Sequence, residues 1–170
     1  MYILGISCFY HDSAACLIRD GEILYAVQEE RFSRKKHDSD FPINSINWML
    51  KEEGISISDI DYVVFYEKPL VKFDRILKTF LGVAPLGLRL FIQTAPFWLK
   101  QKFWVSDLIK NYLNYKGKIL FVSHHQSHAA SAFFPSPFFE SAFLTLDGVG
   151  EWDTASFGIG KDNHIQILYT

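Results

Sequence analysis

Residues 123–150 of the chain read SHHQSHAASAFFPSPFFESAFLTLDGVG and combine a helix, a strand and a glycine turn. Ser123 is a candidate N-cap, and Gln126 stands where a capping box places Glu or Gln. The alanines that follow favour helix, and Pro135 ends it. Because an apolar run at residues 118–122 precedes this stretch, we expect a buried strand, then the helix, then a strand at 142–146.

Two histidines of the predicted helix and one aspartate after it form a candidate metal site. His124 and His128 are four residues apart, so their rings lie on one face, in the first turn where helix N–H groups and the positive dipole end can receive an anion. Asp147 lies at a strand end beside a glycine turn, a usual place for a carboxylate ligand. The histidine spacing alone is also typical of surface or capping residues. A zinc-protease motif needs Glu after the first His, where this chain has His125.

The composition of the chain indicates a globular protein. Its 170 residues are 49% hydrophobic and 21% charged, enough for one sizeable core, or for a small domain and part of another. A formal net charge of −2 gives no indication of nucleic-acid binding. Cys8 and Cys16 lie in apolar runs, as buried thiols of a reducing compartment do. The N-terminus lacks a signal-peptide pattern and no apolar run has membrane-spanning length, so we expect a cytoplasmic protein that binds no membrane.

A pattern of strand, polar turn, strand, turn and strand occurs twice. In the first copy Asp20 and Gly21 form a hairpin turn. A charged run at residues 29–38 follows, for which a solvated loop is the default interpretation. A helix between Pro42 and Gly54 and a short strand at 62–66 come next. The predicted strands of the two copies are residues 2–8, 14–18 and 22–28, and residues 142–146, 154–159 and 164–169.

Residues 69–115 differ from the rest, because they are basic, aromatic and interrupted by Pro85 and Pro96. This composition indicates two or three amphipathic helices. A membrane surface is one place for such a segment; we expect instead a helical insertion whose apolar stripes pack on the domain or on a partner. One stripe consists of Leu70, Phe73, Leu77 and Leu81, and the other of Trp98, Val105 and Tyr112.

The repeated pattern predicts a duplicated α/β architecture. We assign residues 1–140 to a complete first repeat, with the insertion at 69–115, and residues 141–170 to a truncated second repeat. This is the plan of the actin, sugar-kinase and Hsp70 superfamily, a ribonuclease H-like fold in which the first hairpin turn of each repeat points at nucleotide phosphates. Backbone N–H groups of such turns hold phosphate oxygens, and Gly148 and Gly150 allow a close approach.

Four segments resemble one family closely, the ATP-dependent O-carbamoyltransferases of antibiotic and nodulation-factor biosynthesis. They are YHDSAACLIRDGEI at 10–23, VQEERFSRKKHDSDFP at 27–42, VSHHQSHAASAFFPSPF at 122–138 and TLDGVGEWDTASFG at 145–158. The resemblance extends from residue 2 to about 160, with 69–115 as its least diagnostic part. The tRNA threonylcarbamoyladenosine synthase subunit is a more distant relative that shares the histidine helix and the fold, but we do not expect the EERFxRKKH pattern in it.

The resemblance implies an N-terminal domain that binds ATP through a divalent metal, iron in this family and zinc as the alternative. On this chain the ligands are His124, His128 and Asp147, and a later aspartate ligand of the family is absent. The missing C-terminal part of the same protein makes carbamoyl-adenylate from carbamoyl phosphate and ATP. The actin-like part then transfers the carbamoyl group to a hydroxyl of a small-molecule acceptor.

For the transfer, the resemblance implies His11 as the catalytic residue. A base near the hydroxyl is needed, and histidine is the usual one at neutral pH. Without the resemblance, His11 is equally explained as a turn histidine bonded to Asp12 or Ser13. Lys36 would add a point charge beside the phosphates. The expected nucleotide contacts are Asp12, Ser13, Lys36, Gly148 and Gly150.

Other classes of protein share the fold. A sugar or acyl kinase needs a catalytic aspartate and not the histidine pair, and a non-enzymatic ATP-binding switch would use the helical insertion to dock a partner. Only the carbamoyltransferase hypothesis predicts tightly bound iron or zinc. We expect the 170-residue chain to be inactive alone, because the second repeat breaks off and the adenylate-forming part is missing. Its uncovered second sheet should also cause self-association. The acceptor is not identified by the sequence.

Overall fold

The computed structural model of the protein describes residues 1–89, 92–93, 104–148 and 150–170. These residues belong to two compact units, Met1–Tyr66 with Pro96–Phe121, and Glu67–Ala95 with Val122–Thr170. The predicted helix break at Pro96 and the predicted stripe residue Trp98 lie outside the described residues. The assignment of residues 1–140 and 141–170 to two repeats stays a prediction.

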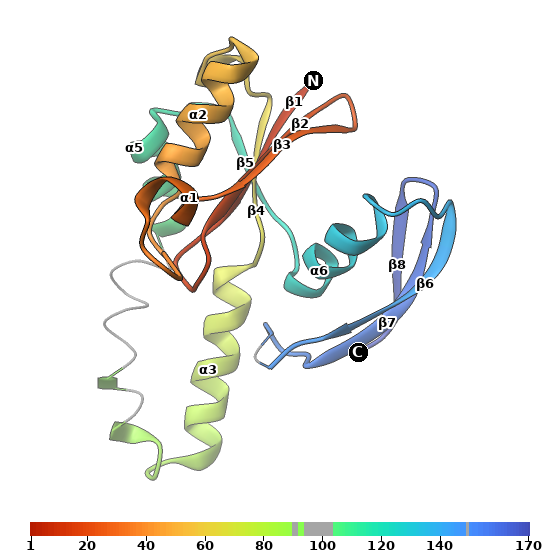
Figure 1. Cartoon of the computed structure of the whole chain (residues 1–170). Coiled ribbons are helices and arrows are strands. Elements are labelled where there is room, and N and C mark those ends of the chain that lie inside the picture. Colours follow the sequence, from red (N-terminus) through yellow and green to blue (C-terminus); the bar gives the residue numbers. More distant parts are fainter. Residues whose placement is uncertain (90–91, 94–103, 149) are drawn as a thin grey trace. The chain divides into compact units, whose positions relative to one another are not determined.

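The first unit is built on a five-stranded mixed sheet. Its strands are β1 (Tyr2–Ser7), β2 (Ala14–Arg19), β3 (Glu22–Gln28), β4 (Tyr62–Phe65) and β5 (Lys118–Phe121). They lie in the order β3-β2-β1-β4-β5, with β1, β2 and β3 antiparallel and β4 and β5 added in parallel (Figure 1). Asp20 and Gly21 turn the second hairpin with φ of 51° and 91°, as predicted for a tight turn that requires left-handed residues.

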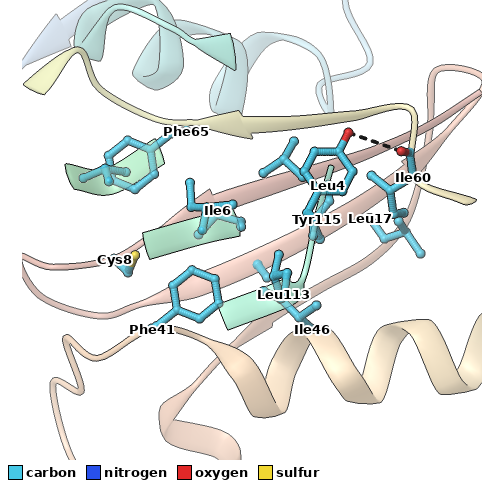
Figure 2. Packing of buried hydrophobic residues seen from close by; sticks show 14 of the residues in the cluster. Leu4, Ile6, Cys8, Leu17, Phe41, Ile46, Ile60, Phe65, Leu113 and Tyr115 are labelled. Carbon is cyan, nitrogen blue, oxygen red and sulfur yellow. Dashed lines mark hydrogen bonds between the residues drawn. The ribbon is translucent and has the colours of Figure 1, made fainter. Parts of the chain in front are cut away.

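Two helices bury their apolar faces in the core of this unit, α2 (Ile43–Glu53) and α5 (Val105–Leu113). Figure 2 shows Leu4 and Leu17 of the sheet in one cluster with Ile46 of α2 and Leu113 of α5. Gly54 ends α2 with a φ of 72°, as its sequence position predicts. Two shorter helices, α1 (Glu30–Ser33) and the 3-10 helix η1 (Ile57–Asp59), also belong to the unit. Cys8 is buried and Cys16 half-buried, and both thiols are free.

Helix α5 lies inside the predicted insertion, yet it is part of this core. Val105, Ile109 and Leu113, each four residues apart, are buried, whereas Tyr112 of the predicted stripe is 54% exposed. A spacing of four keeps side chains on one face of a helix, so the buried stripe is the one through Ile109. The predicted stripe through Tyr112 is therefore wrong.

Two further predictions for the first unit are wrong. Strand β5 is not fully buried, because it lies at the edge of the sheet and leaves Lys118 and Leu120 exposed. The charged run at 29–38 is not solvated throughout, because Glu29 and Asp38 are buried. A carboxylate leaves water only when donors replace the lost hydration, and both have such donors.

The second unit contains helices α3 (Pro69–Val83) and α6 (His124–Phe133) and a sheet of β6 (Glu140–Leu146), β7 (Ala155–Lys161) and β8 (His164–Tyr169). The strands are antiparallel in the order β6-β7-β8 (Figure 1). Helix α6 lies against this sheet, and a Cβ on Gly160 would stand 2.6 Å from the ring of Phe133. The predicted α/β class and the predicted order of strands and helices along the chain, ending in three successive strands, are confirmed.

Much apolar surface of the second unit faces outward in the described residues. Leu144 and Leu146 of β6 are exposed on the face of the sheet that also carries Phe157 of β7. Leu70 and Leu81 of α3 are exposed as well, whereas Phe73 and Leu77 between them are half-buried, so this predicted stripe is packed only in part. Among the described residues, no helix combines the length and apolar character needed to cross a membrane.

Candidate functional site

The three predicted metal ligands converge in the second unit. His124 and His128 stand one turn apart on α6, and Asp147 follows β6 directly. Nε2 of His124 lies 2.7 Å from Oδ2 of Asp147 and 3.1 Å from Nε2 of His128, and the third separation is 4.0 Å. His124 and Asp147 are half-buried and His128 is exposed, so the group opens on the His128 side.

The 3.1 Å separation of the two histidine nitrogens suits a bound divalent cation, whereas the separations of 2.7 and 4.0 Å to Asp147 lie on either side of the range that such a cation sets. A metal with bonds of about 2.1 Å to nitrogen and oxygen sets its neighbouring ligands about 3.0–3.4 Å apart. The two imidazoles and one carboxylate are a donor set suited to iron or zinc. Burial, followed by the neighbouring His128, lowers the pKa of His124, so its ring is neutral at pH 7 and can donate a lone pair.

Asp147 sits on a loop that is attached to the rest of the unit through His125. Nε2 of His125 lies 2.9 Å from the carbonyl of Asp153, while Nδ1 lies 2.7 Å from the Thr145 hydroxyl and 2.9 Å from the Ser156 hydroxyl. A carbonyl only accepts, so Nε2 carries the proton and Nδ1 accepts from a hydroxyl. His125 therefore connects α6 to both strands and to the loop of Asp147, a role that the sequence analysis missed.

The two glycines of this loop differ in what surrounds them. A Cβ on Gly150 would lie 2.9 Å from Nε2 of His125 and would collide with the carbonyl of Asp153, so internal packing already requires glycine there. The Gly150 carbonyl accepts a hydrogen bond from Arg75 of α3. Gly148 has open space on its Cβ side. A role of either glycine in holding phosphate stays a prediction.

Glu151 occupies part of the anion position predicted at the start of α6. Its carboxylate accepts hydrogen bonds from the backbone N–H groups of His124 and of Lys68, which precedes α3. Burial raises the pKa of Glu151, and these two donors oppose that rise. The chain thus places its own carboxylate at the positive ends of two helix dipoles. Close by in sequence, Glu67 and Lys72 form a buried ion pair of 2.9 Å.

The predicted capping box of α6 does not form. Ser123 is the N-cap, but its hydroxyl donates to the side chain of Gln126 at 2.9 Å and its oxygen accepts no hydrogen bond from a backbone N–H of the first turn. The N–H of the first residue, His124, is satisfied by Glu151 instead. A carboxylate that is distant in sequence therefore replaces the local cap.

The turn of His11 lies in the first unit and contains a carboxylate shared by two imidazoles. Oδ2 of Asp12 lies 3.0 Å from Nδ1 of His11, and Oδ1 lies 2.9 Å from Nδ1 of His37. The hydrogen bond from His37, followed by that from His11, lowers the pKa of Asp12. The local alternative for His11, a turn histidine bonded to Asp12, is thus what the structure shows. It leaves Nε2 of His11 available to a substrate.

Ser13 and Lys36, the other two predicted nucleotide contacts of this unit, form no hydrogen bond with His11 among the described residues. Ser13 is buried, its N–H donates to the carbonyl of Asp38 at 2.7 Å, and its hydroxyl has no partner among the described residues. Lys36 is exposed. The neighbouring Lys35 forms ion pairs with Asp38 and Asp40.

Comparison with known proteins identifies the family of this chain. The family described as "Carbamoyltransferase N-terminus" matches residues 2–169. An uncharacterized protein of Synechocystis sp. is 55% identical over 96% of this chain, and nodulation protein NolNO of Sinorhizobium fredii is 35% identical over 95%. The chain spans 28% and 23% of these two relatives, about a quarter of their length. The structure of YeaZ from Pseudomonas aeruginosa aligns with 99% of this chain and 64% of that chain, at 15% identity and a TM-score of 0.48.

Proposed function

This chain belongs to the carbamoyltransferase N-terminus family, and from that membership we propose that it is the nucleotide- and metal-binding part of an O-carbamoyltransferase. The proposed enzyme moves a carbamoyl group from carbamoyl phosphate, by way of carbamoyl-adenylate, to a hydroxyl of a small-molecule acceptor. The observation that carries the proposal is the convergence of His124, His128 and Asp147, whose ligand atoms all lie within 4.8 Å of one another. A kinase of the same fold has no use for this histidine pair.

In this proposal His124, His128 and Asp147 hold iron or zinc. A divalent metal there would orient phosphate oxygens of the nucleotide and offset their negative charge. Lys36 is exposed, and its proposed part is to add a positive charge beside the nucleotide phosphates. Glu151 is not available for this purpose, because two backbone N–H groups already bind its carboxylate.

His11 is the proposed base of the transfer. Its Nε2 takes the proton of the acceptor hydroxyl while the hydroxyl oxygen forms a bond to the carbamoyl carbon. The bond from that carbon to the phosphate oxygen breaks, and AMP leaves. The products are the O-carbamoylated acceptor, AMP and a proton, which His11 releases to solvent because its side chain is 62% exposed.

Elemental analysis of the full-length enzyme tests the metal site. We expect about one iron or zinc per chain, bound through deprotonated ligands. His128→Ala should lower the metal content sharply, whereas His164→Ala, which removes an exposed histidine of β8, should leave it unchanged. An unchanged metal content in His128→Ala would overturn the assignment.

A second experiment tests the base. In the full-length enzyme, His11→Asn should block formation of the carbamoylated product while pyrophosphate release from carbamoyl phosphate and ATP continues. Asparagine keeps a donor toward Asp12 but has no lone pair at the position of Nε2. Product formation at the wild-type rate would show that His11 is not the base.

A further inference from the structure

We propose that His37 is a positioning residue of the transfer site, which acts through Asp12 to hold the His11 imidazole in the tautomer that keeps Nε2 unprotonated. This inference rests on the proposed function, because it concerns the base of that reaction. It assigns a role to a histidine of the charged run for which the resemblance implies no function and which is not a metal ligand. The observation behind it is one carboxylate bonded to the Nδ1 atoms of two imidazoles from different segments.

The shared carboxylate fixes which ring nitrogen carries the proton. An ionised carboxylate can only accept hydrogen bonds, so each Nδ1 that contacts Asp12 must be the donor. In a neutral imidazole the proton on Nδ1 leaves Nε2 with a lone pair. This is the logic by which a buried aspartate orients the histidine of a serine protease. Both histidine side chains are more than 60% exposed, so Nε2 of His11 can reach a substrate.

His37 limits where Asp12 can point. Its Nδ1 binds Oδ1 at 2.9 Å, so Oδ2 is the oxygen left for His11 at 3.0 Å. Without His37 the carboxylate could turn about its own bond and offer either oxygen, or neither, to His11. An exposed pair such as His11 and Asp12 is weakly ordered by itself, because water competes for both partners.

The backbone brings His37 to this position from 25 residues away. The N–H groups of Phe9 and Ser13 donate to the carbonyls of Ser39 and Asp38, at 2.8 and 2.7 Å, so the turn and the charged segment are bonded on both sides of Asp12. The N–H of His37 itself donates to a carboxylate oxygen of Glu30 at 3.2 Å.

Three residues of this small region have left-handed backbone conformations. Phe9, Asp12 and His37 have φ of 68°, 47° and 55°, and none of the three is a glycine, the residue that adopts such values without strain. Such conformations persist only where the surroundings determine them, and they are concentrated at functional sites. The backbone positions of Asp12 and His37 are therefore set by the surrounding fold.

Nitrogen-15 NMR of the histidine rings tests the proposal on the 170-residue chain and does not require an activity assay. At pH 8 the wild-type ring of His11 should be in the Nδ1–H form. His37→Leu removes the donor to Asp12 and should shift His11 toward a mixture of tautomers. His37→Asn keeps a donor at the position of Nδ1 and should preserve the wild-type signature, so it is the matched control. A His11 ring protonated on Nε2 in the wild type, or unchanged in His37→Leu, would overturn the proposal.

The transfer assay in the full-length enzyme gives a second readout. Removing a residue that orients a reacting group's partner typically costs about 10–100-fold, so His37→Leu should lower kcat by about tenfold and leave the acceptor KM unchanged. His37→Asn should recover most of the rate. If the tautomer shifts as expected but His11→Asn remains active, the positioning role stands and the proposed base is wrong. If His11→Asn is inactive but kcat does not fall in His37→Leu, the positioning role has no part in catalysis and the proposal is wrong.

Discussion

Glu29→Ala should destabilise the first unit, because the carboxylate of Glu29 caps helix α2 from outside the helix. Oε1 accepts from the N–H and side-chain amide of Asn44 at 3.1 and 2.6 Å, and Oε2 accepts from the N–H and hydroxyl of Ser45 at 2.9 and 2.7 Å. Pro42, the local N-cap position, supplies no side-chain bond. The first turn of α2 therefore depends on a single buried carboxylate.

The size of the loss follows from burial. Ser45 is fully buried, so its two donors would have no water to bind, at a cost of about 1–2 kcal/mol each. Loss of a negative charge at a helix N-terminus adds roughly 0.5–1 kcal/mol. Asn44 is only partly buried and can turn toward water. The expected decrease in the free energy of unfolding is thus about 2.5–5 kcal/mol, a large part of the 5–15 kcal/mol typical of a domain.

Urea unfolding followed by far-UV circular dichroism measures this decrease, and fluorescence of Trp48, which contacts Tyr25 from within α2, can report the same region. Glu52→Ala is the matched control, because Glu52 is an exposed carboxylate on the same helix and its loss should cost less than about 0.5 kcal/mol. Glu29→Gln should fall between the two, since one amide oxygen replaces two carboxylate oxygens. A loss below about 1 kcal/mol in Glu29→Ala would refute the capping argument.

Four other changes have defined outcomes. Hydrogen bonds from Ser33 and from the backbone of Asp40, together with Lys35, lower the pKa of Asp38 below its ordinary value of 3.8. Ionised Asp38 therefore stabilises the fold above pH 3.8, and this stabilisation is lost as the pH falls through the lowered pKa. Asp38→Asn should therefore reduce unfolding free energy more at pH 7 than at pH 3 in urea titrations at both pH values. Gly160→Ala should lower stability by about 1–3 kcal/mol through a clash with Phe133, seen as a lower Tm; an unchanged Tm would contradict the packing of α6. Leu144→Lys, on the exposed face of the second sheet, should reduce self-association of the 170-residue chain in sedimentation velocity, and an equally associated variant would place the contact elsewhere. His125→Leu should weaken metal binding about tenfold or more in chelator competition although it removes no ligand; equal affinity would deny His125 a positioning role.

The buried carboxylates and His125 share one feature that bears on prediction from sequence. Glu29 lies 15 residues from Asn44, His125 lies 20 and 31 residues from its two hydroxyl partners, and Glu151 lies 83 residues from Lys68. A charged run and an HH pair look the same in sequence whether or not such partners exist. The signal that could have pointed to Glu29 is the lack of a capping side chain at Pro42, which leaves the donors of α2 without a local acceptor.

The sequence by itself determined what depends on neighbours along the chain. Alternating apolar residues located the strands, Asp20 with Gly21 and Gly54 located a hairpin and a helix end, and the spacing of His124 and His128 placed two rings on one face. Only the tertiary structure decided that Asp147 meets that face, that Tyr112 is exposed, and that Glu29 is buried. The physical reason is that a polar group is buried only where the fold supplies its hydrogen-bond partners, and these come from segments whose approach no local pattern encodes.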